Sequence, residues 1–210
     1  KNKNILISCG ATFEKIDDAR AITNLSSGKM GLSIVNEAYA LGANVTLIYG
    51  RTDTMPPSNI KCIYAPNHLM MEKLIKKNVK DNDIFISVAA ISDYIPRKIS
   101  GKLKKDNDKL TLELQRSSDI LSEITSEFKN IFCVGFSAES ENIIKNAQLK
   151  LKNKKLDMIV ANCINESMGH DSAEIYIIDK NEVIHIPKKS KEELASNILQ
   201  HIYKLENKRG

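Results

Sequence analysis

The stretch from Thr23 to Gly31, which reads TNLSSGKMG, combines residue types that suit the binding of an anion. Glycine lets the backbone approach a ligand closely, and the hydroxyl groups of Ser26 and Ser27 can donate hydrogen bonds. The residues that follow have helical periodicity, and the first amides and positive dipole end of a helix favour negative charge. A phosphate or a carboxylate is therefore a suitable guest for this loop.

The loop matches neither of two well-known glycine motifs. The phosphate loop G-x-x-x-x-G-K-[ST] needs Ser or Thr after its lysine, but Lys29 is followed by Met30. The dinucleotide motif G-x-G-x-x-G needs three glycines, and only Gly28 and Gly31 are present. A helix cap with a tight turn is the alternative interpretation of the loop taken alone.

Three further residues have side chains suited to the same chemistry. Arg20 can make bidentate contacts with a carboxylate or a phosphate, and Asn24 offers both a donor and an acceptor. Asp93 follows a run of small residues, where its carboxylate can meet a ribose hydroxyl or hold a magnesium ion through water. Taken singly, each of the three also fits a turn or a surface position.

Lysines are crowded in a segment that contains Pro96 and Gly101, a composition that predicts a mobile loop. Lys102, Lys104 and Lys105 lie in it. A lysine on such a loop can close over a polyphosphate and neutralise charge that develops in a transition state. A run of solvated charges is the alternative interpretation.

Strand patterns alternate with helical patterns along the chain. A loop is expected from the end of the first strand to about Gly28. The expected strands cover residues 4–10, 44–50, 60–65, 83–92, 109–115, 130–139, 157–164 and a hairpin at 174–186. The expected helices cover residues 29–41, 67–80, 119–128, a segment ending near 154, and 190–207. This order predicts one domain over residues 1–210, an α/β fold with a Rossmann-like, mostly parallel sheet and helices on both faces.

An added β segment is expected near residues 98–115, within a flap and dimerisation segment of about 94–116. In open parallel sheets ligands bind beyond the carboxyl ends of the strands. Small or polar residues gather at these ends, in residues 10–12, 49–51, 89–93, 136–139 and 161–162.

Composition narrows the class of protein. Hydrophobic residues make up 42% of the 210 residues, yet no apolar run approaches the roughly 20 residues of a membrane span. The four cysteines are far apart, without a C-x-x-C pair, and the histidines do not join them. We expect reduced thiols, no permanent metal site and a cytoplasmic location. A first residue of Lys indicates a processed or excised chain.

The net charge of +5 suits either a nucleic acid or a small polyanion. A nucleic-acid-binding module would interleave aromatic residues with its lysines, but aromatic residues are only 5% of the chain. A nicotinamide-dependent oxidoreductase would need an acidic residue directly after the second strand, where Gly50, Arg51 and Thr52 stand, with Asp53 one place later. Both stay as alternative functions.

The segments ATFEKIDDARAITNLSSGKMG, AAISDY, GKLKK, GFSAE and AN follow one another in the order and spacing of one family. From about Ile5 to the final helix, the chain resembles phosphopantothenoylcysteine synthetase. The resemblance implies a ligase of coenzyme A biosynthesis that joins 4'-phosphopantothenate to L-cysteine. CTP with Mg²⁺ would activate the carboxylate as an acyl-cytidylate with release of pyrophosphate, and cysteine would then displace CMP.

The resemblance also assigns roles to residues. Asn24 would act on the acyl intermediate and Lys102 on the triphosphate during activation, as the two catalytic residues. Phosphopantothenate would be bound by Arg20, Asn24, Ala89 and Ala90, with Arg20 reaching across a dimer interface. The implied nucleotide-binding residues are Gly10, Ser26, Ser27, Gly28, Ala89, Asp93, Lys102, Ser118, Asp119, Ile120, Leu121, Phe136, Lys150 and Lys154.

The same resemblance implies partners. The family forms homodimers through added strands, and in many bacteria it is fused to a flavin-dependent decarboxylase. Mg²⁺ would arrive with the nucleotide, and no flavin, nucleic acid or membrane is expected to bind this chain. Three positions depart from the family pattern. Ala11 stands where the family has glycine, and a positive φ there would be strained. Ser117 and Ser118 replace the Asn-Pro of the nucleotide loop.

Overall fold

The computed structural model describes residues 3–104, 109–167 and 169–209, so the predicted role of Lys105 lies outside the described residues. Eight strands form the central sheet in the order β12-β11-β10-β9-β6-β1-β4-β5. They are β1 (Asn4–Cys9), β4 (Asn44–Tyr49), β5 (Lys61–Tyr64), β6 (Ile84–Ser87), β9 (Phe132–Glu139), β10 (Met158–Cys163), β11 (Ser172–Asp179) and β12 (Val183–Ser190).

The sheet is parallel except at the β10–β11 and β11–β12 pairs, which confirms the expected Rossmann-like α/β fold. From β1 the chain passes to β4 and β5 on one side and then returns to β6, β9 and β10 on the other. The loops that leave β1 and β6 therefore diverge, and such a switch point is where parallel sheets bind ligands.

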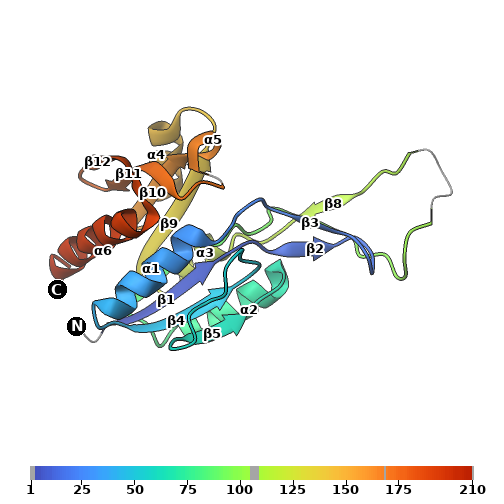
Figure 1. The fold of residues 1–210 in the computed structure, drawn as a ribbon, viewed down its shortest axis with the longest axis horizontal. Helices are drawn as coiled ribbons and strands as arrows, with labels where there is room; N and C mark the ends of the chain where they lie inside the picture. The colour runs from blue at the N-terminus through green and yellow to red at the C-terminus, as the bar shows by residue number, and fades with distance from the viewer. Residues whose placement is uncertain (1–2, 105–108, 168, 210) are drawn as a thin grey trace.

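Helices cover both faces of the sheet, as expected (Figure 1). On one face α1 (Lys29–Ala40) packs beside α6 (Lys191–Asn207). On the other lie α2 (His68–Val79), α3 (Ile120–Glu127) and α4 (Ile143–Asn153), while α5 (Ile164–Ser167) is a single turn. No described helix combines the length and the apolar character needed to cross a lipid bilayer.

Two small antiparallel pairs stand apart from the central sheet. Strands β2 (Phe13–Lys15) and β3 (Ala21–Thr23) form a hairpin where a plain loop was expected. Strands β7 (Tyr94–Pro96) and β8 (Leu114–Arg116) pair at the base of a segment that extends from the body (Figure 1). We call this segment, residues 94–116, the arm. It coincides with the region where an added β segment was expected.

The expected strand at 109–115 is largely wrong. Only its last two residues belong to a strand, β8, and residues 109–113 have no sheet partner among the described residues. Alternation of apolar and polar residues favours an extended chain, but a strand also needs a neighbouring backbone to pair with.

The strand expected at residues 83–92 is also shorter, because β6 ends at Ser87, while most other boundaries lie close to those expected. Ser190 and Glu193 form the expected capping box of α6. The hairpin turns at Lys180 and Asn181 without glycine, because neither residue has a positive φ. The Asp179 carboxylate stabilises this turn by accepting the N–H groups of Asn181, at 2.7 Å, and Glu182, at 3.0 Å.

Candidate functional site

Two adjacent cavities open at the carboxyl ends of the parallel strands. The first, of about 200 Å³, lies at the start of α1, and we call it the α1 pocket. The second, of about 160 Å³, lies at the start of α3, and we call it the α3 pocket. Ala89 and Phe136 line both cavities, so ligands bound in the two would meet there.

The structure distributes the predicted binding residues between the two pockets. The α1 pocket is lined by Gly10, Ser26, Ser27, Gly28, Ala89, Ala90 and Phe136. The α3 pocket is lined by Ala89, Asp93, Ser118, Asp119, Ile120, Leu121, Phe136 and Lys154. Strand β6 ends at Ser87, earlier than expected, and the apolar residues beyond it form the shared wall.

Three residues in the wall of the α1 pocket need to be glycine, because of their backbone conformation or of the atoms packed against them. Gly10 and Gly28 have φ of 75° and 76°, and a Cβ on Gly28 would lie 2.5 Å from Cγ2 of Thr52. A Cβ on Gly31 would lie 2.2 Å from Cβ of Cys9. Ala11 is not among the residues with positive φ, so the strain considered there does not arise.

The start of α1 is left available to a ligand. Gly28 is its N-cap and supplies no side-chain acceptor. The hydroxyl oxygen of Ser26 accepts the Gly28 N–H at 3.3 Å, and that of Ser27 accepts the Lys29 N–H at 3.4 Å. The next amides of a helix start have no partner within the helix, so they can donate to an anion in the pocket.

Asn24 lies at the edge of the α1 pocket without lining it. Its Nδ2 donates to the Ala90 carbonyl at 3.0 Å, which fixes the amide plane beside the shared wall. No hydrogen bond of its Oδ1 is found among the described residues. That oxygen is therefore free to accept a hydrogen bond from a reacting group.

Arg20 and Lys102 do not line either pocket in this chain. The Arg20 guanidinium contacts Asp17 at 3.2 Å and the Leu103 carbonyl at 3.4 Å, while the Asp17 carboxylate accepts the Leu103 N–H at 3.0 Å. Burial raises the pKa of Asp17, but the N–H donors of Ala19, Leu103 and Arg20 outweigh it and lower the pKa. Arg20 and the base of the arm thus form one unit, with Lys102 exposed beside it.

The lysines of the α3 pocket have carboxylate partners. Lys154 lies 2.9 Å from Asp119, which also caps α3 by accepting the Ser122 N–H. Lys150 lies outside the lining and contacts Glu139 at 2.6 Å and the Ser137 hydroxyl at 3.0 Å. Burial opposes ionisation of both carboxyls, yet their hydrogen bonds, chiefly those from the lysines, lower the pKa of Asp119 and of Glu139.

Sequence reasoning missed the residues that hold the Ser118 loop. Nε2 of the buried His68 contacts the Ser118 carbonyl at 2.9 Å, and the Ser118 hydroxyl donates to Glu72 at 2.9 Å. The His68 N–H donates to Glu14 at 2.8 Å. These contacts join the start of α2 to the loop before α3. No local pattern reports them, because the partners lie far apart in the sequence.

Lys191 was also missed. It is the first residue of α6, lines the α1 pocket and is only 6% exposed. One signal was readable in the sequence: the capping box places a lysine in the first helical turn, where the helix dipole disfavours positive charge.

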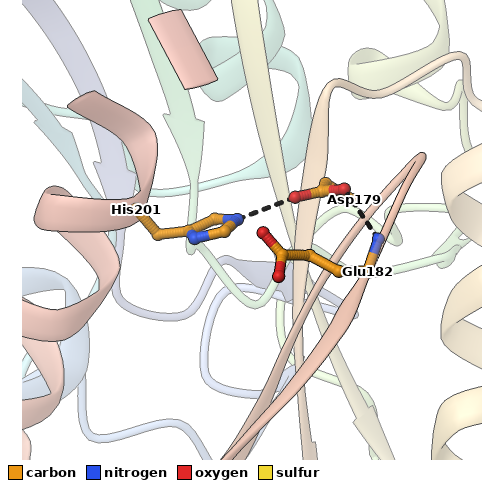
Figure 2. A group of neighbouring side chains, drawn as sticks. All are labelled: Asp179, Glu182 and His201. Atoms are coloured by element: carbon orange, nitrogen blue, oxygen red, sulfur yellow. Dashed lines mark hydrogen bonds and ion pairs between the residues drawn. The ribbon is translucent and has the colours of Figure 1, made fainter. Parts of the chain in front are cut away.

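A further polar cluster lies at the other end of the strands, where Asp179 pairs with Met158, the first residue of β10. Figure 2 shows its three side chains, Asp179, Glu182 and His201. Asp179, Glu182 and His201 bring potential metal ligands within 4.8 Å of one another. Nε2 of His201 already contacts Asp179 at 2.8 Å, and Glu182 contacts Lys204 at 3.0 Å. The cluster therefore fastens α6 to the β11–β12 turn, and a metal would have to displace these contacts.

A family model described as DNA/pantothenate metabolism flavoprotein C-terminal domain matches residues 1–205. The chain belongs to this family. The chain is 38% identical over 207 residues to the coenzyme A biosynthesis bifunctional protein CoaBC of Borreliella burgdorferi, covering 97% of this chain and 53% of that protein. The chain thus spans about half the length of the curated relatives it matches.

Solved structures agree with the assignment to this flavoprotein C-terminal domain family. A crystal structure of the C-terminal domain of CoaBC matches with a TM-score of 0.84 and 34% identity, covering 96% of this chain and 94% of that one. A mutant of Cab2 in complex with phosphopantothenate-cysteine matches with a TM-score of 0.76 and 16% identity, covering 97% and 87%. At that identity the second likeness concerns the fold alone.

Proposed function

We propose that this chain is a phosphopantothenate–cysteine ligase, acting with CTP in coenzyme A biosynthesis. The observation that carries the proposal is the pair of adjoining cavities with Ala89 and Phe136 as a common wall. A ligase of this kind must bring a nucleotide and a carboxylic acid together, and each cavity offers groups suited to phosphorylated ligands. The family match and the relatives named for coenzyme A biosynthesis support the same reaction.

The reaction would run in two balanced steps. A carboxylate oxygen of 4'-phosphopantothenate bonds to the α-phosphorus of CTP, and the bond to the leaving pyrophosphate breaks. The amine of cysteine then bonds to the acyl carbon and loses a proton, and CMP leaves with the electron pair of the acyl–oxygen bond. Such an activated acyl group needs no nucleophilic Ser or Cys from the protein, which agrees with the burial of Cys9.

Charge is the main obstacle, because CTP and phosphopantothenate together carry about six negative charges. Ser26, Ser27 and the start of α1 would bind phosphoryl oxygens in the α1 pocket. Asn24, held by Ala90, would orient the acyl group near the shared wall. Lys102 would approach the triphosphate when the arm closes.

Magnesium fits the residues of the α3 pocket. The Asp93 carboxylate lines this cavity and has no hydrogen bond or ion pair among the described residues. Carboxylate oxygens are the ligands that Mg²⁺ prefers, usually one or two together with phosphate oxygens. When bound, the ion would neutralise charge on the phosphates, while Asp93 would keep it at the mouth of the α3 pocket.

The arm supports a dimer within the same proposal. Tyr94, Leu110 and Leu114 are exposed apolar residues of the arm, with exposed fractions of 55%, 59% and 44%. Paired arms would cover them and could bring Arg20 of one protomer toward the partner's phosphopantothenate. Fusion to a flavin-dependent decarboxylase accords with relatives that are named bifunctional. We place the reaction in the cytoplasm, where CTP and cysteine are supplied.

Pyrophosphate release tests the proposal. The purified chain is mixed with 4'-phosphopantothenate, Mg²⁺ and either CTP or ATP, with and without cysteine. Release that needs CTP and phosphopantothenate, followed by CMP and product once cysteine is added, is the expected result. Release with ATP but not with CTP would support the ligase reaction with ATP as its nucleotide. No release with any nucleotide, from protein shown to be folded, would overturn the proposed function.

A further inference from the structure

Lys191 occupies an electrostatically unfavourable position. As the first residue of α6 it places a positive charge where the helix dipole is already positive. Its exposed fraction is 6%, so most of the hydration of its side chain is lost as well. A protein retains such an arrangement only where something else compensates for it.

Compensation among the described residues is only partial: Asp171 and Glu192 lie close enough to favour the charge, but neither bonds to the ammonium. The Lys191 ammonium has no hydrogen bond or ion pair there, although its backbone N–H donates to the Asp171 carbonyl at 3.1 Å. The Asp171 carboxylate is instead paired with Lys29. Burial and the nearby Lys29 lower the pKa of the Lys191 ammonium, and together they outweigh Asp171 and Glu192, which raise it. The other lysines near the cavities, Lys150 and Lys154, have carboxylate partners.

The surroundings of Lys191 offer a place for the missing partner. Lys191 lines the α1 pocket together with Ser26, Ser27 and Gly28. Since α1 and α6 pack side by side, the starts of both helices border this cavity (Figure 1). An anion in the pocket would receive hydrogen bonds from amides and hydroxyls on the α1 side and from the ammonium on the α6 side.

We propose that Lys191 is a substrate-binding residue whose ammonium contacts a phosphoryl group seated at the start of α1. The inference rests on the proposed function and extends its phosphate site to a residue on a second helix. A phosphoryl group fits because it has several acceptor oxygens and a charge near −2, which the amides alone would neutralise only in part.

The phosphoryl group can come from 4'-phosphopantothenate or from the triphosphate of CTP. Other walls of the pocket are mixed: Val160 and Ile175 are apolar, while Lys29 and Asn162 are polar. Both sources share the chemistry that Lys191 recognises, so kinetics must distinguish them.

Three variants test the inference. Lys191→Met removes the charge but keeps an unbranched side chain of similar length, and Lys191→Arg restores a cation. Lys188→Met is the matched control, because Lys188 is an exposed lysine of β12, three residues before Lys191. We expect Lys191→Met to raise the apparent KM of one phosphorylated substrate by about tenfold or more, as loss of a charged hydrogen bond does. The substrate affected identifies the source of the phosphoryl group.

The two other variants serve as controls. Lys191→Arg should recover part of the effect, and Lys188→Met should behave as wild type.

Unchanged KM values for both substrates in Lys191→Met would overturn the inference, even if the unfolding temperature moved. A binding measurement separates this from failure of the proposed function. Pyrophosphate is titrated into wild type and Lys191→Met by calorimetry, without any turnover. Weaker binding to the variant supports the anion role even if the ligase assay fails. Equal binding to the two proteins, or none to wild type, contradicts it.

Discussion

The α1 and α3 pockets share a wall, but they differ in whether their lysines are paired with carboxylates. In the α1 pocket, Lys191 is buried without a carboxylate partner, beside the uncapped start of α1. At the α3 pocket, Lys154 and Lys150 are each held by a carboxylate, from Asp119 and Glu139. Lys191 therefore lacks the carboxylate partner that Lys154 and Lys150 have. The contrast concerns these lysines and not every cation, because Lys29 of the α1 pocket is paired with Asp171, and Arg116 lines the α3 pocket without an ion pair among the described residues.

The difference indicates two ways of binding phosphorylated molecules. A carboxylate partner orients a lysine but cancels much of its field. The α1 pocket can attract an anion by charge and by fixed amides. The lysines at the α3 pocket are held by carboxylates, so this cavity would rely more on Arg116 in its wall, on Asp93 with magnesium, and on cations that the arm brings. The predictions below test this contrast.

The largest effect compares two tightly packed glycines, Gly31 in the wall of the α1 pocket and Gly135 in the core beneath the sheet's other helices. Gly31→Ala places a Cβ 2.2 Å from Cβ of Cys9, on an adjacent buried strand, whereas Gly135→Ala meets the end of the Leu156 side chain at 2.7 Å. We expect Gly31→Ala to lower the free energy of unfolding by about 3 kcal/mol and Gly135→Ala by about 1 kcal/mol, since a side-chain end moves more easily. Urea unfolding measures both. Equal losses would show that the surroundings of Gly31 are no more rigid than those of Gly135.

The next effect separates the two chemical steps. Asn24→Asp replaces the donor to the Ala90 carbonyl by a carboxylate, so its position and charge both become wrong for an acyl intermediate. We expect pyrophosphate release to continue while product formation falls about 100-fold. Lys102→Gln should instead slow pyrophosphate release itself by a similar factor. Quenched time courses that resolve the acyl-nucleotide distinguish the two, and the opposite pattern would exchange their roles.

Acid sensitivity probes the contact that holds α6, the helix whose first residue lines the α1 pocket. Burial raises the pKa of Asp179, but the Asn181 N–H, His201 and the Glu182 N–H outweigh it, so the pKa lies below the ordinary 3.8. A lowered pKa contributes stability that is fully present above the unfolded pKa and is lost as pH falls through the folded one. We expect Asp179→Asn to cost about 1 to 3 kcal/mol at pH 7 and less as the pH falls below about 4.

A matched control is Glu174→Gln, which breaks the more exposed pair with His185 and should cost less than about 1 kcal/mol. Because His201 fastens α6, whose first residue is Lys191, Asp179→Asn should also weaken the ligand of the α1 pocket more than that of the α3 pocket. Thermal unfolding across pH and KM measurements give both results. An acid profile that the variant leaves unchanged would exclude Asp179 as its source.

The smallest effect is expected beside the α3 pocket, where Lys150 is already paired with Glu139. Glu139→Gln frees Lys150 from its carboxylate while keeping a hydrogen-bond acceptor for the Ser137 hydroxyl. The added positive charge should lower the apparent KM for the nucleotide by about two- to fivefold, more at low salt. A higher KM would mean that the carboxylate serves mainly to orient Lys150.

Much of the fold was readable from the sequence, because periodicity and caps are local signals. Ser190 with Glu193 placed the start of α6, and the alternation of buried strands with helices placed the sheet. The β2–β3 hairpin was missed because strands of three residues are too short to show a period. The strand at 109–113 was wrong because its pattern carried no information about a partner.

The candidate site shows the same contrast between residues found from local motifs and residues whose role depends on distant segments. Motif residues such as Ser26 and Asp93 were found, and the structure gathers most of them around two cavities. His68 and Lys191 were not, since their importance comes from burial beside distant segments. Whether the assigned residues act as proposed is for the variants to decide.

Asp17 couples the local unfolding of the arm's base to that of the β2–β3 turn. One buried carboxylate accepts the N–H groups of Ala19 and Arg20 and, far along the chain, that of Leu103. A local opening that frees one of these amides must break the same cluster of bonds that protects the others. In hydrogen–deuterium exchange they should therefore lose protection together, as one cooperative unit, although more than eighty residues of sequence separate Arg20 from Leu103.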